Sequence, residues 1–382
     1  MQVDGRLIRV YVGVSDMKLG IDESQRSARV RHALSNGARS GTDRPPRLLL
    51  VADVGPVHTH LAAVSSEDGT VRPVADRKYP TGAYEAIGAM ARAFLLETEL
   101  EVETACISVP CMVTRGTARL DDPPWQFDEA ELARQLPVQN VWLLNDIVAT
   151  ATAIPLLPRT ELHRVKDGEP VEGGPMAVLV PGERLRVCLL MPDSAAASGY
   201  RAHPSAGGHA AATPMTPIEL DLVRRLWHSF EEPSFEHVPS AVSIPELYDF
   251  LRDRDPLVES PYLAAMLPSA RDRTRTILDA ACNRVELDPL ARSTLDLYLQ
   301  ILGAHAANLA LTVFATGGIY LAGKMARRLK RELVSPAFLE PLLRVGMACE
   351  PLERLPVFVL RGDVAMFGAA HEGLRLSRAL CR

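Results

Sequence analysis

Two aspartates stand where strand-like segments end, and both are placed for chemistry on a hydroxyl or a phosphate. Asp146 follows the apolar run 141–144 and Asn145, and Asp53 follows the apolar run 48–52. A carboxylate at the end of a buried strand, just before a helix, is well placed to take a proton from a hydroxyl. The two segments together predict the frame of a phosphotransfer site in which Asp146 is the general base.

The turn after Asp53 departs from the pattern that a phosphate cradle needs. Gly55 is followed by Pro56, Val57 and His58, where Gly, Thr or Ser would supply backbone or hydroxyl donors. Proline has no N–H group and restricts the turn. The sequence therefore retains the strand-end aspartates of a phosphotransfer site more clearly than the turn residues that would bind a phosphate.

Composition excludes several classes of protein. The chain has 382 residues, of which 47% are hydrophobic and 23% charged, which predicts a globular protein with two cores. A net charge of -5 without a Lys/Arg block argues against nucleic acid. No apolar run reaches the ~18 residues of a membrane span, and the N-terminus lacks a signal-peptide core. Six scattered cysteines show no metal spacing, so we expect a cytoplasmic protein with no metal site.

The order of expected elements predicts two α/β lobes after an N-terminal extension, residues 1–46, which we expect to be flexible. Thr81 is the expected N-cap of a helix at 84–97. The other expected elements are strands at 47–54, 60–65, 71–79, 106–109 and 141–144, a helix at 146–154, a hairpin of 176–180 with 186–191, helices at 217–230, 244–253, 274–286 and 290–312, strands at 318–323 and 357–360, and a helix at 364–379. They predict a duplicated core with a cleft between a smaller lobe, 47–157 plus 364–382, and a larger lobe, 158–363.

The motifs between Leu48 and Leu374 resemble one family, the bacterial glucokinases of the actin-like ATPase superfamily. The resemblance rests on residues 51–55, 144–146, 153–155, 169–173, 207–209, 308–311 and 319–323. It implies a two-lobed, ribonuclease H-like α/β fold, transfer of phosphate from Mg-ATP to the 6-hydroxyl of glucose, and a homodimer through the larger lobe.

The resemblance also implies roles for residues of the sugar site. Asp146 matches the family's catalytic base and Asn145 a glucose ligand. His209 matches the sugar-binding His of a Glu-Gly-Gly-His segment, and Glu236 aligns with a second sugar-binding Glu.

Two sugar-site positions depart from the family. The first Glu of the Glu-Gly-Gly-His segment is Ala206 in this chain, and a sugar-binding Asn that precedes a Trp is replaced by Asp122. A lost hydroxyl contact leaves polar groups unpaired, at about 1–3 kcal/mol each. We therefore expect weakened or altered sugar binding.

The turns expected to bind the nucleotide depart further from the family pattern than the sugar site does. Of the family's cofactor-binding turns, this chain keeps Asp53 with Gly55, Gly182 in the segment 180–186, and Gly323. Glu183, beside Gly182, would bring a carboxylate toward a triphosphate, a repulsion of roughly 4 kcal/mol at ~4 Å and a dielectric near 20. The departures predict that nucleotide binding is lost.

Each of these residues also has a purely structural interpretation. Asp146 would then cap the following helix, Asp53 would be an ordinary turn residue, His209 a loop residue, and Glu236 a solvated surface residue. The basic segment that starts at Lys324 would be a solvated helix face or would meet an acidic partner.

Three hypotheses of function follow. The first is a catalytically impaired glucokinase homologue, without a nucleotide cofactor, that binds a hexose or a protein. The second is an active ATP-dependent glucokinase that binds Mg-ATP through Arg184, Arg186 or Lys324. The third is a structural partner that binds no small molecule.

Overall fold

A computed structural model describes residues 48–67, 70–228, 233–234, 237–254, 259–283, 285–344 and 353–380. The predicted extension, 1–46, and Glu236 lie outside these residues. The chain divides into two compact units. Unit 1 contains the described residues up to Glu161 and from Gly362 onward, and unit 2 runs from Leu162 to Arg361. The lobe boundaries expected from the sequence remain a proposal.

Unit 1 is built on a five-stranded mixed sheet. Its strands, in spatial order, are β3 (Thr70–Pro80), β2 (His58–Glu67), β1 (Leu49–Asp53), β4 (Thr104–Val109) and β7 (Asn140–Asn145). The strands β3, β2 and β1 form an antiparallel meander, whereas β1, β4 and β7 are parallel. The carboxyl ends of β1, β4 and β7 therefore meet at one edge of the sheet.

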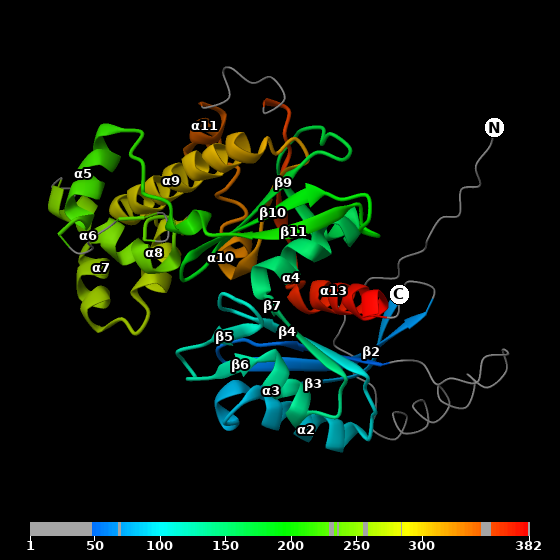
Figure 1. Ribbon diagram of the computed structural model, residues 1–382. Helices are drawn as coiled ribbons and strands as arrows, with labels where there is room; N and C mark the ends of the chain where they lie inside the picture. The colour runs from blue at the N-terminus through cyan, green and yellow to red at the C-terminus, as the bar shows by residue number, and fades with distance from the viewer. Residues whose placement is uncertain are drawn as a thin grey trace, which may run out of the picture. The chain divides into compact units, whose positions relative to one another are not determined.

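Helices cover both faces of this sheet (Figure 1). The further elements of unit 1 are α2 (Ile87–Thr98), α3 (Glu129–Gln135), α4 (Asp146–Ala153), α13 (Ala365–Leu380), a small hairpin of β5 (Thr117–Arg119) and β6 (Gln126–Asp128), and the 3-10 turns η1 (Thr81–Ala83), η2 (Ile154–Leu156) and η3 (Arg159–Glu161). The helices α2 and α3 pack on one face, and α4 and α13 pack on the other.

Alternation along β1 explains the two cores of unit 1. Leu50 and Ala52 belong to the core under α2 and α3, whereas Leu49 and Val51 belong to the core under α13, because successive strand residues face opposite sides. A side chain on Gly368 of α13 would collide with the carbonyl oxygen of Ala149 on α4. Glycine at this position lets the two helices lie in backbone contact.

Unit 2 repeats this sheet order and adds one strand. Its strands, in spatial order, are β11 (Tyr200–Ser205), β10 (Leu185–Pro192), β9 (Met176–Pro181), β12 (Gly318–Leu321), β13 (Val357–Leu360) and β8 (Leu162–Lys166). An antiparallel meander again leads into parallel strands, β9, β12 and β13, and β8 pairs antiparallel at the edge. The repeat confirms the predicted duplicated α/β core.

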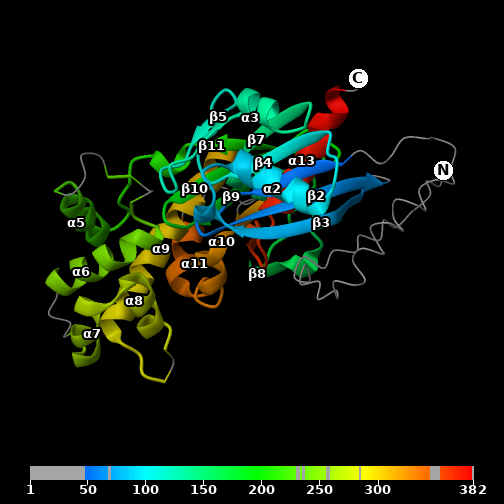
Figure 2. The ribbon, with the colours of Figure 1, turned by 90° about the horizontal axis from the view of Figure 1, so that it is seen from below.

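Helices make up most of unit 2 outside its sheet. They are α5 (Pro217–Leu226), α6 (Ile244–Arg254), α7 (Pro261–Met266), α8 (Arg273–Ala281), α9 (Pro289–Val313), α10 (Gly323–Arg328) and α11 (Pro336–Arg344), with the 3-10 turns η4 (Gly207–His209), η5 (Ala241–Ser243) and η6 (Leu267–Ser269). The long helix α9 is buried along most of its length, and α6, α8 and α11 pack against it (Figure 2).

One expected helix start is wrong. Thr81 does not cap the following helix, because α2 begins at Ile87 with Ala86 as its N-cap residue. The hydroxyl of Thr81 is buried and donates to the carbonyl oxygen of Gly55 at 2.7 Å. This hydrogen bond joins residues 26 positions apart and stabilises the β1–β2 turn. Among the described helices, none is both long and apolar enough to span a bilayer.

Candidate functional site

The strand edge of unit 1 brings the two predicted aspartates together. Asp53 ends β1 and is in register with Ser108 of β4, and Val109 of β4 is in register with Asn145 of β7. Asp146 follows as the first residue of α4. Residues nearly a hundred positions apart in the sequence thus reach one sheet edge.

Electrostatics at this edge favour a proton on Asp53. Burial is the largest of the causes that raise the pKa of Asp53 to about 7, followed by the charge of Asp363 and, less strongly, the charge of Asp146. The hydroxyl of Ser108, which donates to Oδ1 of Asp53 at 3.0 Å, acts in the opposite direction. Two neighbouring carboxylates therefore act on Asp53, which changes its charge near neutral pH.

Asn145 positions Asp146. The side-chain oxygen of Asn145 accepts a 3.1 Å hydrogen bond from the backbone N–H of Ile147, which makes Asn145 the N-cap of α4. Its side-chain nitrogen donates to the carbonyl oxygen of Cys111 at 2.8 Å. The structural interpretation of Asp146 as the helix cap is therefore wrong. Asp146 lies in the first turn, where the helix dipole favours a negative charge.

The turn after Asp53 is held by hydrogen bonds within unit 1. The backbone N–H of Val54 donates to the carbonyl oxygen of Ser108, and that of Thr81 donates to the carbonyl oxygen of Val57, both at 2.9 Å. The Val57 side chain is 66% exposed. The turn carries an apolar side chain at its tip and Pro56, which supplies no donor, beside it.

Asp122 lies in the loop between β5 and β6, and it is exposed. The following Trp125 is buried and anchors the loop. Burial raises the pKa of the Cys111 thiol, and the charges of Asp146 and of Asp121 add to that rise. This loop and Asp146 therefore both lie within electrostatic range of Cys111.

In unit 2, the segment aligned with the second phosphate turn forms a tight β-hairpin between β9 and β10. Pro181 pairs with Leu185, and the backbone N–H of Gly182 donates to the carbonyl oxygen of Arg184 at 3.3 Å. The nearest atom to a side chain built on Gly182 would be 3.6 Å away. Gly182 therefore has room for a methyl group, and Glu183 is exposed at the tip.

The turn that carries His209 packs against this hairpin. Gly208 is buried, and a side chain on it would collide with the carbonyl oxygen of Leu185. Ser205 accepts a 3.1 Å hydrogen bond from the backbone N–H of Gly207, and His209 is exposed. The structure thus brings His209 and the 181–185 hairpin together within unit 2.

Gly323 follows β12 and opens α10 with a φ of +89°, and a side chain on it would lie 2.9 Å from Val180. Glycine is required there both for the backbone angle and for the close contact. The basic helix that follows is only partly solvated, because Arg328 pairs with Asp279 of α8 at 2.7 Å.

Two residues of the site in unit 1, Asp363 and Ser108, are not among those predicted from the sequence. Asp363 lies beyond the last strand, far from Asp53 in sequence, and Ser108 lies inside an apolar strand. Both lie at or just beyond the carboxyl end of a strand, as Asp53 and Asp146 do, and this position could have indicated them from the sequence. Across the part of the chain that the structure describes, no group of three or more His, Cys, Asp or Glu is arranged to hold a metal ion.

The two hairpin-led sheets, with carboxylates at the parallel strand ends of unit 1, define a protein of the actin-like ATPase fold, the class that includes sugar kinases. The sequence model of the family described as Glucokinase matches residues 50–375. The chain belongs to the glucokinase family.

Individual proteins agree with this assignment. A glucokinase of Synechocystis sp. is 31% identical over 344 residues, which cover 84% of this chain and 96% of that protein. The crystal structure of a glucokinase from an Antarctic psychrotroph has a TM-score of 0.71 at 21% identity and covers 86% of this chain and 99% of its own. The Balamuthia mandrillaris glucokinase, solved in complex with glucose, has a TM-score of 0.69 at 17% identity and covers 94% of this chain and 99% of its own.

Proposed function

We propose that this member of the glucokinase family binds a hexose and has lost most of the ATP-dependent phosphotransfer of its relatives. The observation that carries the proposal is the closed hairpin at 181–185. Phosphoryl transfer depends on backbone N–H groups and cations that hold the phosphates in place. Pro181 has no N–H group, and that of Gly182 is bonded to Arg184 within the turn.

The other residues of the 181–185 hairpin and of the turn after Asp53 also argue against binding of a nucleotide. Glu183 adds an exposed carboxylate at the hairpin tip, and Pro56 and Val57 occupy the first turn. These residues do not fit a triphosphate cradle of the glucokinase type.

The sugar half is better preserved. Asp146 is held at the first turn of α4 by Asn145, whose two side-chain polar atoms each bond to the backbone. In unit 1, Asp146 accepts hydrogen bonds from a sugar hydroxyl, and Asn145 and Asp122 are further sugar-binding residues. The family resemblance adds His209 and Glu236 to the proposed sugar-binding residues. A relative solved with glucose supports a hexose as the ligand.

The proposal includes three further expectations that rest on the family resemblance and on the net charge of -5. The protein is cytoplasmic, it does not bind nucleic acid, and it forms a homodimer through the larger lobe predicted at 158–363.

One observation favours an active glucokinase as the second candidate. Asp53 and Asp146 still share the strand edge of unit 1, where Asp146 would take the proton of the sugar hydroxyl. In unit 2, the cationic residues Arg184, Arg186 and Lys324 would then replace backbone donors to the phosphates.

The test combines thermal shifts with a coupled assay of glucose phosphorylation. Wild type, Asp146→Asn and the exposed control Asp121→Asn are measured with glucose and, separately, with Mg-ATP. We expect glucose to raise the Tm of wild type and of Asp121→Asn, and Mg-ATP to leave it unchanged. Turnover that Asp146→Asn abolishes and Asp121→Asn preserves would show an active kinase. No response to either ligand would contradict both candidates.

A further inference from the structure

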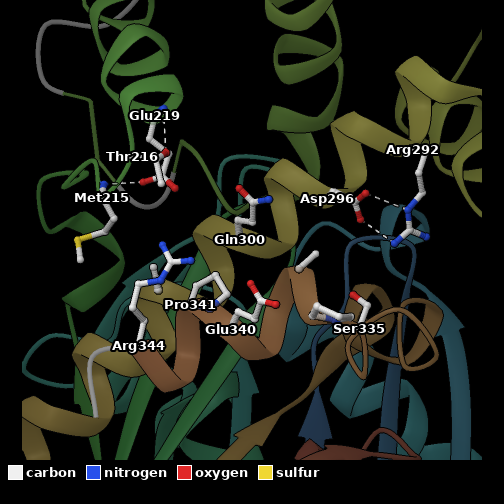
Figure 3. Close-up of a pocket in the computed structure, with 13 residues that line it drawn as sticks. Met215, Thr216, Glu219, Arg292, Asp296, Gln300, Ser335, Glu340, Pro341 and Arg344 are labelled. Atoms are coloured by element: carbon white, nitrogen blue, oxygen red, sulfur yellow. Dashed lines mark hydrogen bonds and ion pairs between the residues drawn. The ribbon is translucent and has the colours of Figure 1, made fainter. Parts of the chain in front are cut away.

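A cavity of about 410 Å³ lies in unit 2 between α9, α11 and the start of α5 (Figure 3). One face of α9 lines it with residues spaced four apart, namely Arg292, Asp296, Gln300 and Ala304, which a helix places in one row. None of these belongs to the hairpin or to the His209 turn. The volume is in the range of pockets that hold small organic molecules.

The walls of the cavity are fixed by backbone contact. A side chain on Gly303 would collide with the carbonyl oxygen of Phe338 on α11, and Phe338 itself is fully buried. The helices α9 and α11 therefore lie as close as their backbones allow. Because this contact fixes the two helices, the cavity between their neighbouring turns is part of the folded structure.

The wall contributed by α11 is rich in hydrogen-bond acceptors. Pro341 lies inside the helix, and because it has no N–H group, the carbonyl of Ala337 lacks its usual helical donor. Glu340 adds an exposed carboxylate between them. The hydroxyl of Ser335, also on the lining, is buried with no hydrogen-bond partner among the described residues. This wall is suited to a ligand that donates hydrogen bonds.

The charge of the lining is predominantly negative. Arg292 pairs with Asp296 and with Glu332, each at 2.6 Å, so its positive charge is more than balanced. Glu219 is buried at the start of α5, where it accepts a 2.6 Å hydrogen bond from the backbone N–H of Met215. With Glu340 added, carboxylates outnumber guanidiniums even when Arg344 is included. The field in the cavity favours a cation.

An organic cation fits better than a metal ion. The carboxylates are spread along the cavity, and none of the described acidic clusters has the arrangement that holds a metal. Pro336, Pro341 and Ala304 supply aliphatic walls, which suit methylene groups. Figure 3 shows Gln300 and Glu340 on the facing helices α9 and α11, whereas the Asp296 carboxylate is turned toward Arg292.

We propose that this cavity binds a small aliphatic ammonium ion, either a simple amine or an amino acid, with its ammonium group held by the carboxylate of Glu340 and the side-chain oxygen of Gln300. Arg344, at the opposite end from Asp296 in Figure 3, would meet the carboxylate of an amino acid.

The test is isothermal titration of the full chain in phosphate buffer, which contains no competing amine. We expect 1,4-diaminobutane to bind saturably and its neutral analogue 1,4-butanediol not to bind. Glu340→Gln should weaken the amine about tenfold, because a charge-assisted hydrogen bond is lost. The exposed Glu286→Gln, which does not line the cavity, should bind as wild type does.

Two further arms distinguish the source of the ammonium group. Tighter binding of glycine than of ethanolamine, weakened by Arg344→Gln, would identify an amino acid, whereas equal binding would identify a simple amine. Absence of saturable amine binding, equal binding of the diol, or equal affinities of Glu340→Gln and Glu286→Gln would each overturn the proposal. None of these results depends on glucose or ATP.

Discussion

The hydroxyl of Ser108 donates a 3.0 Å hydrogen bond to Oδ1 of Asp53, between two parallel strands of unit 1. The bond gives Asp53 a fixed orientation at the sheet edge. It also lowers the pKa of Asp53, against the larger effects of burial and of the charge of Asp363, which together raise it to about 7. The edge therefore holds a carboxyl group whose charge state depends on pH in the physiological range.

Replacing Asp53 with Asn should stabilise the protein at pH 8 and have little effect at pH 4. The folded pKa of about 7 lies above the ordinary value of 3.8, so the folded state binds the proton more tightly. This contribution to stability is fully present below pH 3.8 and is lost as pH rises to about 7. At pH 8, above both pKa values, we expect Asp53→Asn to gain roughly 4 kcal/mol in the free energy of unfolding.

Urea denaturation of wild type and Asp53→Asn between pH 4 and pH 8 checks this. Asn still accepts the hydrogen bond from Ser108, so the variant changes the charge and little else. Parallel pH profiles for the two proteins would contradict the raised pKa.

Replacing Asn145 with Ala should lower both stability and the response to glucose. The substitution removes the N-cap of α4 and the bond to Cys111, at about 1 kcal/mol for the cap. The matched control is Asp128→Ala, which removes the N-cap of α3. Both should lower the free energy of unfolding, and only Asn145→Ala should reduce the thermal shift with glucose. Equal glucose shifts in the two variants would show that Asn145 does not position Asp146 for a sugar.

Replacing Gly208 with Ala should disrupt the His209 turn, whereas Gly207→Ala should be tolerated. The added methyl group at 208 meets the carbonyl oxygen of Leu185, while at 207 the nearest atom is the Ser205 hydroxyl at 3.2 Å. We expect Gly208→Ala to cost about 1–3 kcal/mol in the free energy of unfolding and to weaken glucose binding. Thermal denaturation with and without glucose measures both effects, and indistinguishable variants would refute the close contact.

Gly182→Ala tests the loss of the phosphate cradle. The site has room for a methyl group, so we expect a change of less than about 0.5 kcal/mol in the free energy of unfolding and no change in the response to Mg-ATP. Gly323→Ala is the contrast, because a φ of +89° and the contact with Val180 forbid the side chain; a loss of about 1–3 kcal/mol is expected. A response to Mg-ATP that Gly182→Ala removes would show that the hairpin still holds a nucleotide.

The fold could be predicted because the strands and helices carry strong local signals. The strand expected at 141–144 is β7, and the helix expected at 290–312 is α9, each within about one residue of its observed ends. Thr81 was misassigned for a different reason. A threonine before a helical pattern is a good cap, and only the fold of the meander reveals that its hydroxyl reaches Gly55.

The sequence by itself determined the duplicated α/β architecture and the strand-end position of Asp53 and Asp146, since alternation, apolar runs and helix periodicity are local properties. Tertiary structure alone decided which charges act on Asp53, because Asp363 approaches it only after α13 folds back onto the sheet. It also decided that Asn145 caps α4, that Gly208 lies on Leu185, and that α9, α11 and the start of α5 border a cavity. Contacts of this kind depend on distances of a few ångströms between residues remote in sequence, and no local pattern encodes them.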